Sequence, residues 1–134
     1  MGVNRGRLAT LACLGAVLVC VTAFADARIS VTSPAFKAGG NIPERFTCHG
    51  ANGSPPLQFV GIPAGAKTLA LVMEDPDAPG GLFTHWLLWN VAPVTNDIAE
   101  KAVPPGAVQG TNDFGKNGYG GPCPPSGSHR CRTS

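Results

Sequence analysis

The sequence predicts an all-β-dominated domain, in which antiparallel sheets pack as a sandwich with short helical segments in the connections. The apolar runs are brief and are separated at close spacing by Gly, Pro and Asn, which is typical of short strands joined by turns. No long stretch places apolar residues at the 3.6-residue period of an amphipathic helix. Together these observations favour a β-sandwich over a helical bundle.

The first predicted strands lie in the N-terminal half of the chain. Residues 28–36 begin with apolar and polar residues in alternation, the pattern of a half-buried strand. Residues 38–66 contain short apolar pieces cut by Gly, Pro and Asn, so we expect loops that join brief strands there.

Two stronger strands follow. Residues 67–75 contain a continuous apolar run, which predicts a central strand, and residues 85–91 form a second buried strand rich in aromatic residues. The connection over residues 76–84 contains two prolines and two glycines, which predicts a stiff turn and makes it a candidate for a cis peptide bond. The polar segment 94–102 is expected to be a short helix or a turn.

The N-terminal segment has the three parts of a secretory signal peptide. Arg5 and Arg7 precede an apolar run over residues 8–24, and the run ends in a small-x-small sequence. The run is short for a retained membrane span of about 20 residues. Bulky residues before Cys20 disfavour lipid attachment there. We therefore expect cleavage after Ala25 and a periplasmic or secreted protein without a stable membrane span.

Cleavage would leave one domain, residues 26–134, after a signal at residues 1–25. Arg5 and Arg7 leave with the signal, so the 10 basic residues of the chain fall to the number of its acidic residues, 8. A formally neutral domain without a basic cluster offers nucleic acid no electrostatic footprint, and we expect no nucleic-acid partner.

Three cysteines remain in this domain, Cys48, Cys123 and Cys131. An odd number in an oxidising compartment indicates one disulfide and one spare thiol. The spacing of the cysteines leaves their pairing open.

Polar residues suited to anion binding lie at strand ends and in stiff loops. Asp75 and Asp77 stand where the central strand meets the DPDAP turn, His85 begins the next strand, and His129 follows the Gly- and Pro-rich segment 120–127. An Asp beside a His favours the imidazolium form, which donates both of its N–H groups, and loop amides can line an anion-binding concavity. Each residue alone is ordinary in a turn or at a strand end. Together they predict a pocket for a phosphate or carboxylate head-group.

Signatures of catalysis are missing from the sequence. It contains no HxH, HExxH or CxxC spacing for zinc, no GxSxG nucleophile elbow and no GxxxxGK[ST] phosphate loop. Cys123 lies between Pro122 and Pro124, which suits a structural thiol better than a nucleophile. We expect a protein that is not an enzyme and that has no metal or cofactor.

Two segments carry a resemblance to a known family. DPDAPGG with THWLLWNV, and later NDFGKNGYGGPCPPSGSHR, are similar to the two signature regions of the phosphatidylethanolamine-binding proteins, also called the Raf kinase inhibitor protein family. FTCHGANGSPPL resembles the bacterial YbhB/YbcL-type branch. The resemblance covers residues 29–130 and implies a sandwich of two antiparallel sheets with a small pocket for phosphate or phosphorylated head-groups. Family members generally bind and modulate kinases, proteases or signalling pathways and are not established enzymes.

The resemblance also implies individual residues of the pocket, which are two acids, two histidines and one loop. They are Asp75, Asp77, His85, His129, Gly121, Pro122, Pro124, Pro125 and Gly127. The bacterial branch often has cysteines at the positions of Cys48 and Cys123, which implies a disulfide between these two and leaves Cys131 over.

The C-terminus departs from the family pattern. After His129 and Arg130 the pattern continues with a pocket Tyr, an aromatic-rich strand, a helical segment and a further strand, whereas this chain has Cys131 and then RTS. We expect a C-terminally truncated domain that lacks the final strand and helix and leaves Leu69, Leu71 and Leu87 without cover. A frameshift or premature stop is the hypothesis for this ending.

Three functional hypotheses follow, in order. The first is an exported protein that binds a small anionic or phosphorylated ligand in a His/Asp pocket. The second is a protease or kinase inhibitor that acts through a surface loop, and a non-functional truncated product is a further alternative. The third is an enzyme acting on a phosphoester, with His85 as acid-base group and Asp75 as its orienting partner.

Overall fold

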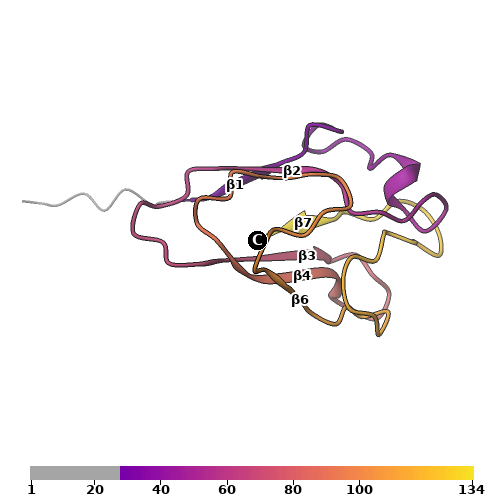
Figure 1. The fold of residues 1–134 in the computed structure, drawn as a ribbon. Helices are drawn as coiled ribbons and strands as arrows, with labels where there is room; N and C mark the ends of the chain where they lie inside the picture. Colours follow the sequence, from indigo (N-terminus) through magenta and orange to yellow (C-terminus); the bar gives the residue numbers. More distant parts are fainter. Residues whose placement is uncertain (1–27) are drawn as a thin grey trace, which may run out of the picture.

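The computed structural model describes residues 28–134, so the predicted signal peptide lies outside the described residues. The chain forms two antiparallel sheets in separate layers (Figure 1). The first sheet, in the order β1-β2-β5, contains β1 (Ser30–Thr32), β2 (Leu57–Val60) and β5 (Asp97–Ile98). The second, in the order β6-β4-β3-β7, contains β3 (Leu69–Asp75), β4 (Phe83–Val91), β6 (Val108–Gln109) and β7 (Arg132–Thr133). The fold class predicted from the sequence is confirmed.

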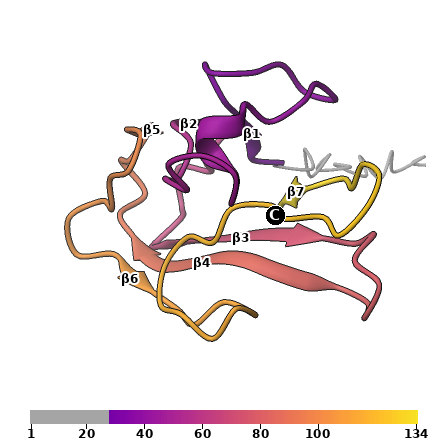
Figure 2. The same cartoon turned by 90° about the vertical axis from the view of Figure 1, so that its right-hand side faces the viewer.

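Helical structure is sparse in the part of the chain that the structure describes. It consists of one short 3-10 helix, η1 (Glu44–Phe46), in the connection between β1 and β2. Figure 2 shows η1 on the side of the molecule where the yellow C-terminal loop returns toward β3. No helix within residues 28–134 has both the length and the apolar character needed to cross a membrane.

The two strongest sequence predictions correspond to the two longest strands. β3 is flanked by β4 on one side and by β7 on the other, so the predicted central position is confirmed. Side chains alternate along β3, and Leu71, Met73 and Asp75 are the buried members. Asp75 therefore continues the buried face of the strand at its last position, where the apolar core gives way to a carboxylate.

The core lies between the two sheets. Its buried residues come from both layers and are Leu57, Phe59, Leu71, Met73, Trp86, Leu88, Val91 and Ile98. Leu71 is only 2% exposed, and Leu69 packs against this cluster. The expectation that Leu71 would lack cover was therefore wrong, because the β1-β2-β5 sheet packs over it.

Three local expectations need correction. Only Ser30–Thr32 of the segment 28–36 is a strand. The segment 94–102, expected to be a short helix or a turn, has turns at both ends and no helix, and between the turns it contains β5, whose Ile98 pairs with Leu57 and is buried in the core. No peptide bond among residues 28–134 is cis, and the DPDAP turn contains a hydrogen bond from the Asp77 N–H to Asp75 Oδ1, at 2.7 Å.

The last residues of the chain pair with β3. Thr133 stands opposite Met73 in the register of β7, and Arg132 stands opposite Glu74. Ser134 and Val72 exchange two backbone hydrogen bonds, of 2.9 and 3.0 Å. The described C-terminus thus extends the second sheet along the free side of β3.

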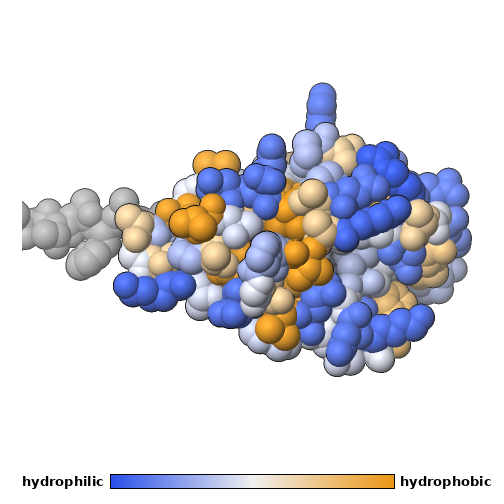
Figure 3. All heavy atoms as spheres, viewed as in Figure 1, coloured by the Kyte–Doolittle hydropathy of each residue, from blue (hydrophilic) through white to orange (hydrophobic). Residues whose placement is uncertain are grey.

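The surface mixes polar and apolar groups. On the face shown in Figure 3, apolar side chains lie in small groups between polar ones. The exposed large apolar residues come from several elements and include Val60, Leu82, Trp89, Val94, Val108 and Phe114.

Candidate ligand-binding site

An Asp–His pair stands at the end of β3. The His129 Nδ1–H donates to Asp75 Oδ2 at 2.6 Å, across 54 positions of sequence. The two side chains are only 12% and 7% exposed. The carboxylate fixes which ring nitrogen carries the proton and leaves Nε2 of His129 available to a ligand.

A second acid–base pair lies next to the first. The Arg130 guanidinium donates from Nε to Asp77 Oδ2 at 2.9 Å and from Nη2 to Asp77 Oδ1 at 2.7 Å, and the Arg130 backbone N–H donates to Oδ2 at 2.9 Å. These bonds hold the pKa of Asp77 well below its usual range and raise that of Arg130. The DPDAP turn and residues 129–130 are therefore joined by two neighbouring acid–base pairs. Both carboxylate oxygens of Asp77 accept hydrogen bonds from Arg130.

Replacing Asp77 by asparagine is expected to remove a contribution to the free energy of unfolding that is present near neutral pH and lost in acid. The pKa of Asp77 is depressed in the folded state relative to its ordinary value of 3.8. Its contribution is therefore complete above about pH 5 and is lost progressively as the pH falls below about 4. Because Arg130 is largely exposed, the difference should be small and weaker in high salt. Urea unfolding of both proteins at several pH values measures it, and a difference that grows toward acid contradicts the assignment.

His85 occupies an irregular position in β4. Met73 pairs with Trp86 and the next residue of β3, Glu74, pairs with Thr84, so His85 is an extra residue on the β4 side. Such a β-bulge re-aims a side chain, and it explains why the consecutive residues His85 and Trp86 are both buried.

The His85 ring is held by the loop that follows β6. Its Nδ1–H donates to the Gly120 carbonyl at 2.7 Å, and the Gly120 N–H donates to the His85 carbonyl at 2.8 Å. Phe83 and Phe114 lie beside the ring, with centroid distances of 5.1 and 5.8 Å. Nε2 is buried and has no hydrogen-bond partner among the described residues. His85 thus presents one unpaired ring nitrogen inside the protein.

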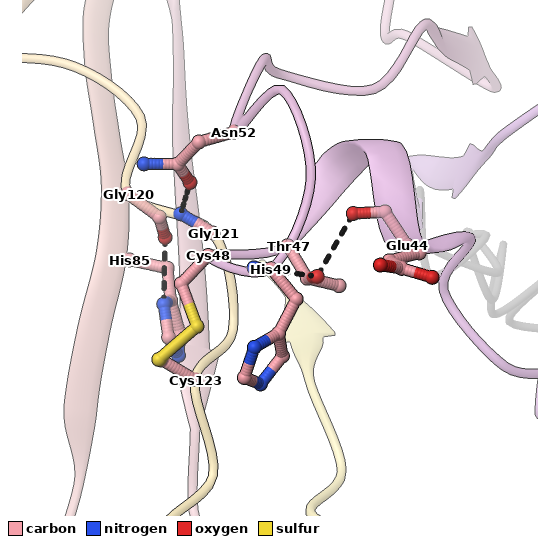
Figure 4. Close-up of a disulfide and its surroundings, with 9 residues drawn as sticks. All are labelled: Glu44, Thr47, Cys48, His49, Asn52, His85, Gly120, Gly121 and Cys123. Carbon is pink, nitrogen blue, oxygen red and sulfur yellow. Dashed lines mark hydrogen bonds between the residues drawn. A yellow bond between two sulfur atoms is a disulfide. The ribbon is translucent and has the colours of Figure 1, made fainter.

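The loop around Gly121 is fastened to the segment that follows η1 (Figure 4). The Gly121 N–H donates to Asn52 Oδ1 at 2.7 Å, and Cys48 is joined to Cys123 by a disulfide. This is the pairing that the resemblance implied. A β-carbon at Gly121 would overlap the Phe46 carbonyl oxygen, so only glycine fits where the two segments meet. The Pro-rich loop is therefore fixed just before it reaches His129.

A groove of about 870 Å³ runs between β1, η1 and the C-terminal loop. Four of the pocket residues predicted from the sequence line it, namely Pro122, Pro124, Gly127 and His129. The other predicted residues do not line it, and these are Asp75, Asp77, His85, Gly121 and Pro125. The structure thus brings His129 and the loop to the groove, with Asp75 behind His129, and keeps His85 buried.

Cations outnumber anions along the groove. Lys37, Arg130 and Arg132 line it, against one acid, Glu44. The two arginines are paired with Asp77 and Glu74, whereas the ion pairs found within residues 28–134 do not involve Lys37. Lys37 is therefore a cation along the groove that an anionic ligand can pair with, and the imidazoles of His49 and His129 also line the groove.

Cys131 lies half-buried in the same groove, where the resemblance places a tyrosine. Burial, together with the charges of Asp75 and Asp77, raises the pKa of its thiol to about 11 from an ordinary value of 9.0. Because the thiolate is the reactive form, Cys131 is expected to be alkylated by iodoacetamide at pH 8 about 100-fold more slowly than in urea. Mass spectrometry of the labelled chain measures both rates, and equal rates contradict the prediction.

The family model for phosphatidylethanolamine-binding proteins matches residues 32–132. The chain belongs to this family. A solved member, the family homologue CT736 of Chlamydia trachomatis, is 43% identical and covers 80% of this chain and 72% of its own, with a TM-score of 0.75. Escherichia coli YbcL, described as a new member of the mammalian family, is 38% identical and covers 75% of this chain and 71% of its own, with a TM-score of 0.70.

Relatives known from sequence extend the comparison. A UPF0098 protein of Archaeoglobus fulgidus is 51% identical over 111 residues, which are 78% of this chain and 38% of that protein. LppC of Mycobacterium tuberculosis, named as a lipoprotein, is 46% identical over 100 residues, which are 75% of this chain and 49% of that protein. The matched region therefore spans less than half the length of these two relatives.

Three residues that fix the site were not found from the sequence. Arg130 holds Asp77, Asn52 holds Gly121, and Gly120 holds His85. His129 and Arg130 are adjacent in the sequence, and the two acids that they bind, Asp75 and Asp77, are two positions apart. This spacing is the sequence signal that would have suggested the two neighbouring acid–base pairs. Asn52 and Gly120 carry no comparable signal, because loop Asn and Gly are common.

Proposed function

We propose that this chain binds a small anionic or phosphorylated head-group in the groove, with His129 as its principal contact. The observation that carries the proposal is the Asp75–His129 hydrogen bond of 2.6 Å at the groove wall. The membership of the phosphatidylethanolamine-binding protein family supports the same class of ligand.

The chemistry of the pair suits a phosphate or carboxylate group. Asp75 accepts from the Nδ1–H of His129 and fixes the ring, so that Nε2 can form a hydrogen bond with a ligand oxygen. Burial of both side chains keeps the local dielectric low and strengthens that bond. Lys37, which also lines the groove, adds a positive charge.

Inhibition of a protease or kinase through a surface loop is the second candidate. The observation that favours it is the Pro-rich loop after Cys123, where Pro125, Ser126, Gly127 and Ser128 are exposed and the disulfide holds one end. A loop pre-ordered in this way loses little conformational entropy when a partner binds it. The partner would be a kinase or a protease.

Catalysis is the least favoured role. His85 would be the acid-base group of a phosphoesterase, but its ring is 2% exposed and does not line the groove. Release of phosphate from a phosphoester above that of a denatured-protein blank would be required to retain this reading.

Calorimetric titration with O-phosphoethanolamine and with inorganic phosphate tests the proposal. His129→Ala is expected to weaken binding by about 10- to 100-fold, because a hydrogen bond to a charged group contributes about 1.5–3 kcal/mol. Asp75→Asn keeps the shape and one acceptor oxygen but removes the charge, so it should also weaken binding. Asp97→Asn, the same change at the exposed residue of β5, is the matched control and should bind like the parent protein.

The titrations distinguish binding in the groove from inhibition through the surface loop. Equal affinities of the parent and of folded His129→Ala would contradict binding through His129. Inhibition of a partner enzyme that survives His129→Ala would favour the loop, and comparison of the two ligands shows whether the ethanolamine moiety contributes.

We also propose that the protein acts outside the cytoplasm, in the cell envelope or beyond it. The signal-like sequence at residues 1–25 supports this location. The similarity to LppC, named as a lipoprotein, supports an envelope location as well.

A further inference from the structure

A histidine stands beside the disulfide, apart from the Asp75–His129 pair. The two sulfur atoms of Cys48 and Cys123 and one ring nitrogen of His49 all lie within 4.8 Å of one another. Figure 4 shows the His49 ring next to the sulfur atoms. His49 and Cys123 are exposed, and Cys48 is half-buried, so solutes can reach the group.

The His49 ring is not committed to another contact within residues 28–134. The hydrogen bond of this residue is made by its backbone N–H, which donates to Thr47 Oγ1 at 3.3 Å. Neighbouring backbone bonds hold the segment in place, since the Gly50 N–H donates to the Thr47 carbonyl at 3.1 Å and the Cys48 N–H to the Pro122 carbonyl at 3.2 Å. The ring nitrogen is thus presented to the sulfurs by an ordered turn.

We propose that Cys48, Cys123 and His49 form a zinc site when the disulfide is reduced. Two thiolates and one imidazole are a ligand set that Zn²⁺ accepts, with a water molecule or another ligand in the fourth position. Zinc–sulfur bonds of about 2.3 Å and zinc–nitrogen bonds of about 2.0 Å in tetrahedral geometry set ligand atoms roughly 3.5–3.8 Å apart. After reduction the two sulfurs have to move apart to reach this spacing, whereas the His49 nitrogen, already within 4.8 Å of both, has to move closer.

The change of state is a two-electron reduction. A dithiol reductant breaks the S–S bond of Cys48 and Cys123, becomes a disulfide itself, and leaves its two protons on the new thiols. Zn²⁺ then displaces those two protons and bonds to both sulfurs and to the His49 nitrogen. Because protons are released, zinc affinity increases with pH.

Either state joins the same two loops. The disulfide connects the turn after η1 to the Pro-rich loop that leads to His129, and the zinc ion would connect them after reduction. The site therefore exchanges a covalent link for a metal link according to the redox conditions, and does so without using the Asp75–His129 pair.

Zinc titration of the full chain tests the proposal. Cys13→Ser, Cys20→Ser and Cys131→Ser are introduced so that Cys48 and Cys123 are its only cysteines. Zn²⁺ is measured by competition with a chromophoric chelator before and after reduction with a phosphine. The expected result is one tightly bound zinc ion per reduced chain and none at comparable affinity in the oxidised chain.

Histidine variants distinguish this site from other imidazoles. His49→Ala should lower the zinc affinity of the reduced chain at least tenfold, whereas His129→Ala, the matched control, should leave it within about threefold. Failure to bind zinc after reduction, or an affinity unchanged by His49→Ala, overturns the proposal.

A second measurement tests the proposal even if reduction of the disulfide loosens the fold. Zinc that binds the folded state raises the thermal midpoint of the reduced chain, and it restores the near-ultraviolet circular dichroism if reduction has loosened the fold. If zinc neither raises the thermal midpoint nor restores the circular dichroism, the proposal is also overturned.

Discussion

Replacing Trp86 by alanine is expected to lower the free energy of unfolding by about 3–5 kcal/mol. Trp86 is fully buried in the core, packs edge-on against Tyr119 at a centroid distance of 5.7 Å, and donates from Nε1 to Gln109 Oε1 at 2.9 Å. The substitution leaves a cavity and an unpaired amide. Since domains of this kind are stable by about 5–15 kcal/mol, much of the total would be lost.

Trp89→Ala is the matched control for this prediction. It makes the same chemical change three residues further along β4, where the side chain is 46% exposed. Denaturant unfolding of both variants should show a loss for Trp89→Ala well below that for Trp86→Ala. Similar losses at the two positions would mean that the core is not packed around Trp86.

Removal of the disulfide is expected to lower the free energy of unfolding by about 4 kcal/mol. The bond joins residues 75 positions apart, and a link across so long a loop removes much of the conformational entropy of the unfolded chain. The double variant Cys48→Ala/Cys123→Ala measures the effect when it is unfolded in denaturant with a metal chelator present.

Reduction of the parent protein provides the control for this second prediction. A phosphine reductant should lower the stability of the parent to about that of the double variant and should leave the double variant unchanged. A loss below about 1 kcal/mol in both comparisons contradicts the stabilising role of the bond.

The sequence predicted the fold where apolar patterning is strong. β3 and β4 carry the long apolar runs, and their pairing forms the middle of the second sheet. β5 and β7 have two residues each and no pattern of their own, because pairing with longer strands determines them. The polar segment 94–102 was therefore predicted to be a short helix or a turn, although it also contributes a strand residue, Ile98, to the core.

The candidate site was predictable in its residues more than in its geometry. Asp75 and His129 were singled out as chemically suited, and the structure bonds them directly. Residues 85–91 were predicted as a buried strand, but the bulge at His85 was not predictable, because it is defined by the register of two strands. Asp77 was predicted to face the ligand, but it is bonded to the Arg130 guanidinium instead.

The proposed zinc site at the disulfide had a faint signal in the sequence. His49 directly follows Cys48, but Cys123, the third proposed ligand, is 75 positions from Cys48. Only the folding of the Pro-rich loop against the turn after η1 brings it there. Spacing motifs for zinc detect ligands close in sequence and do not detect this arrangement.

The central claim is that an anionic head-group binds at Nε2 of His129. The chain has three histidines, so long-range ¹H–¹⁵N spectra can follow every imidazole during a titration with O-phosphoethanolamine. A saturable shift of the His129 Nε2 resonance that exceeds the shifts of the His49 resonances is the predicted result. Saturable binding that leaves the His129 ring unmoved would contradict it.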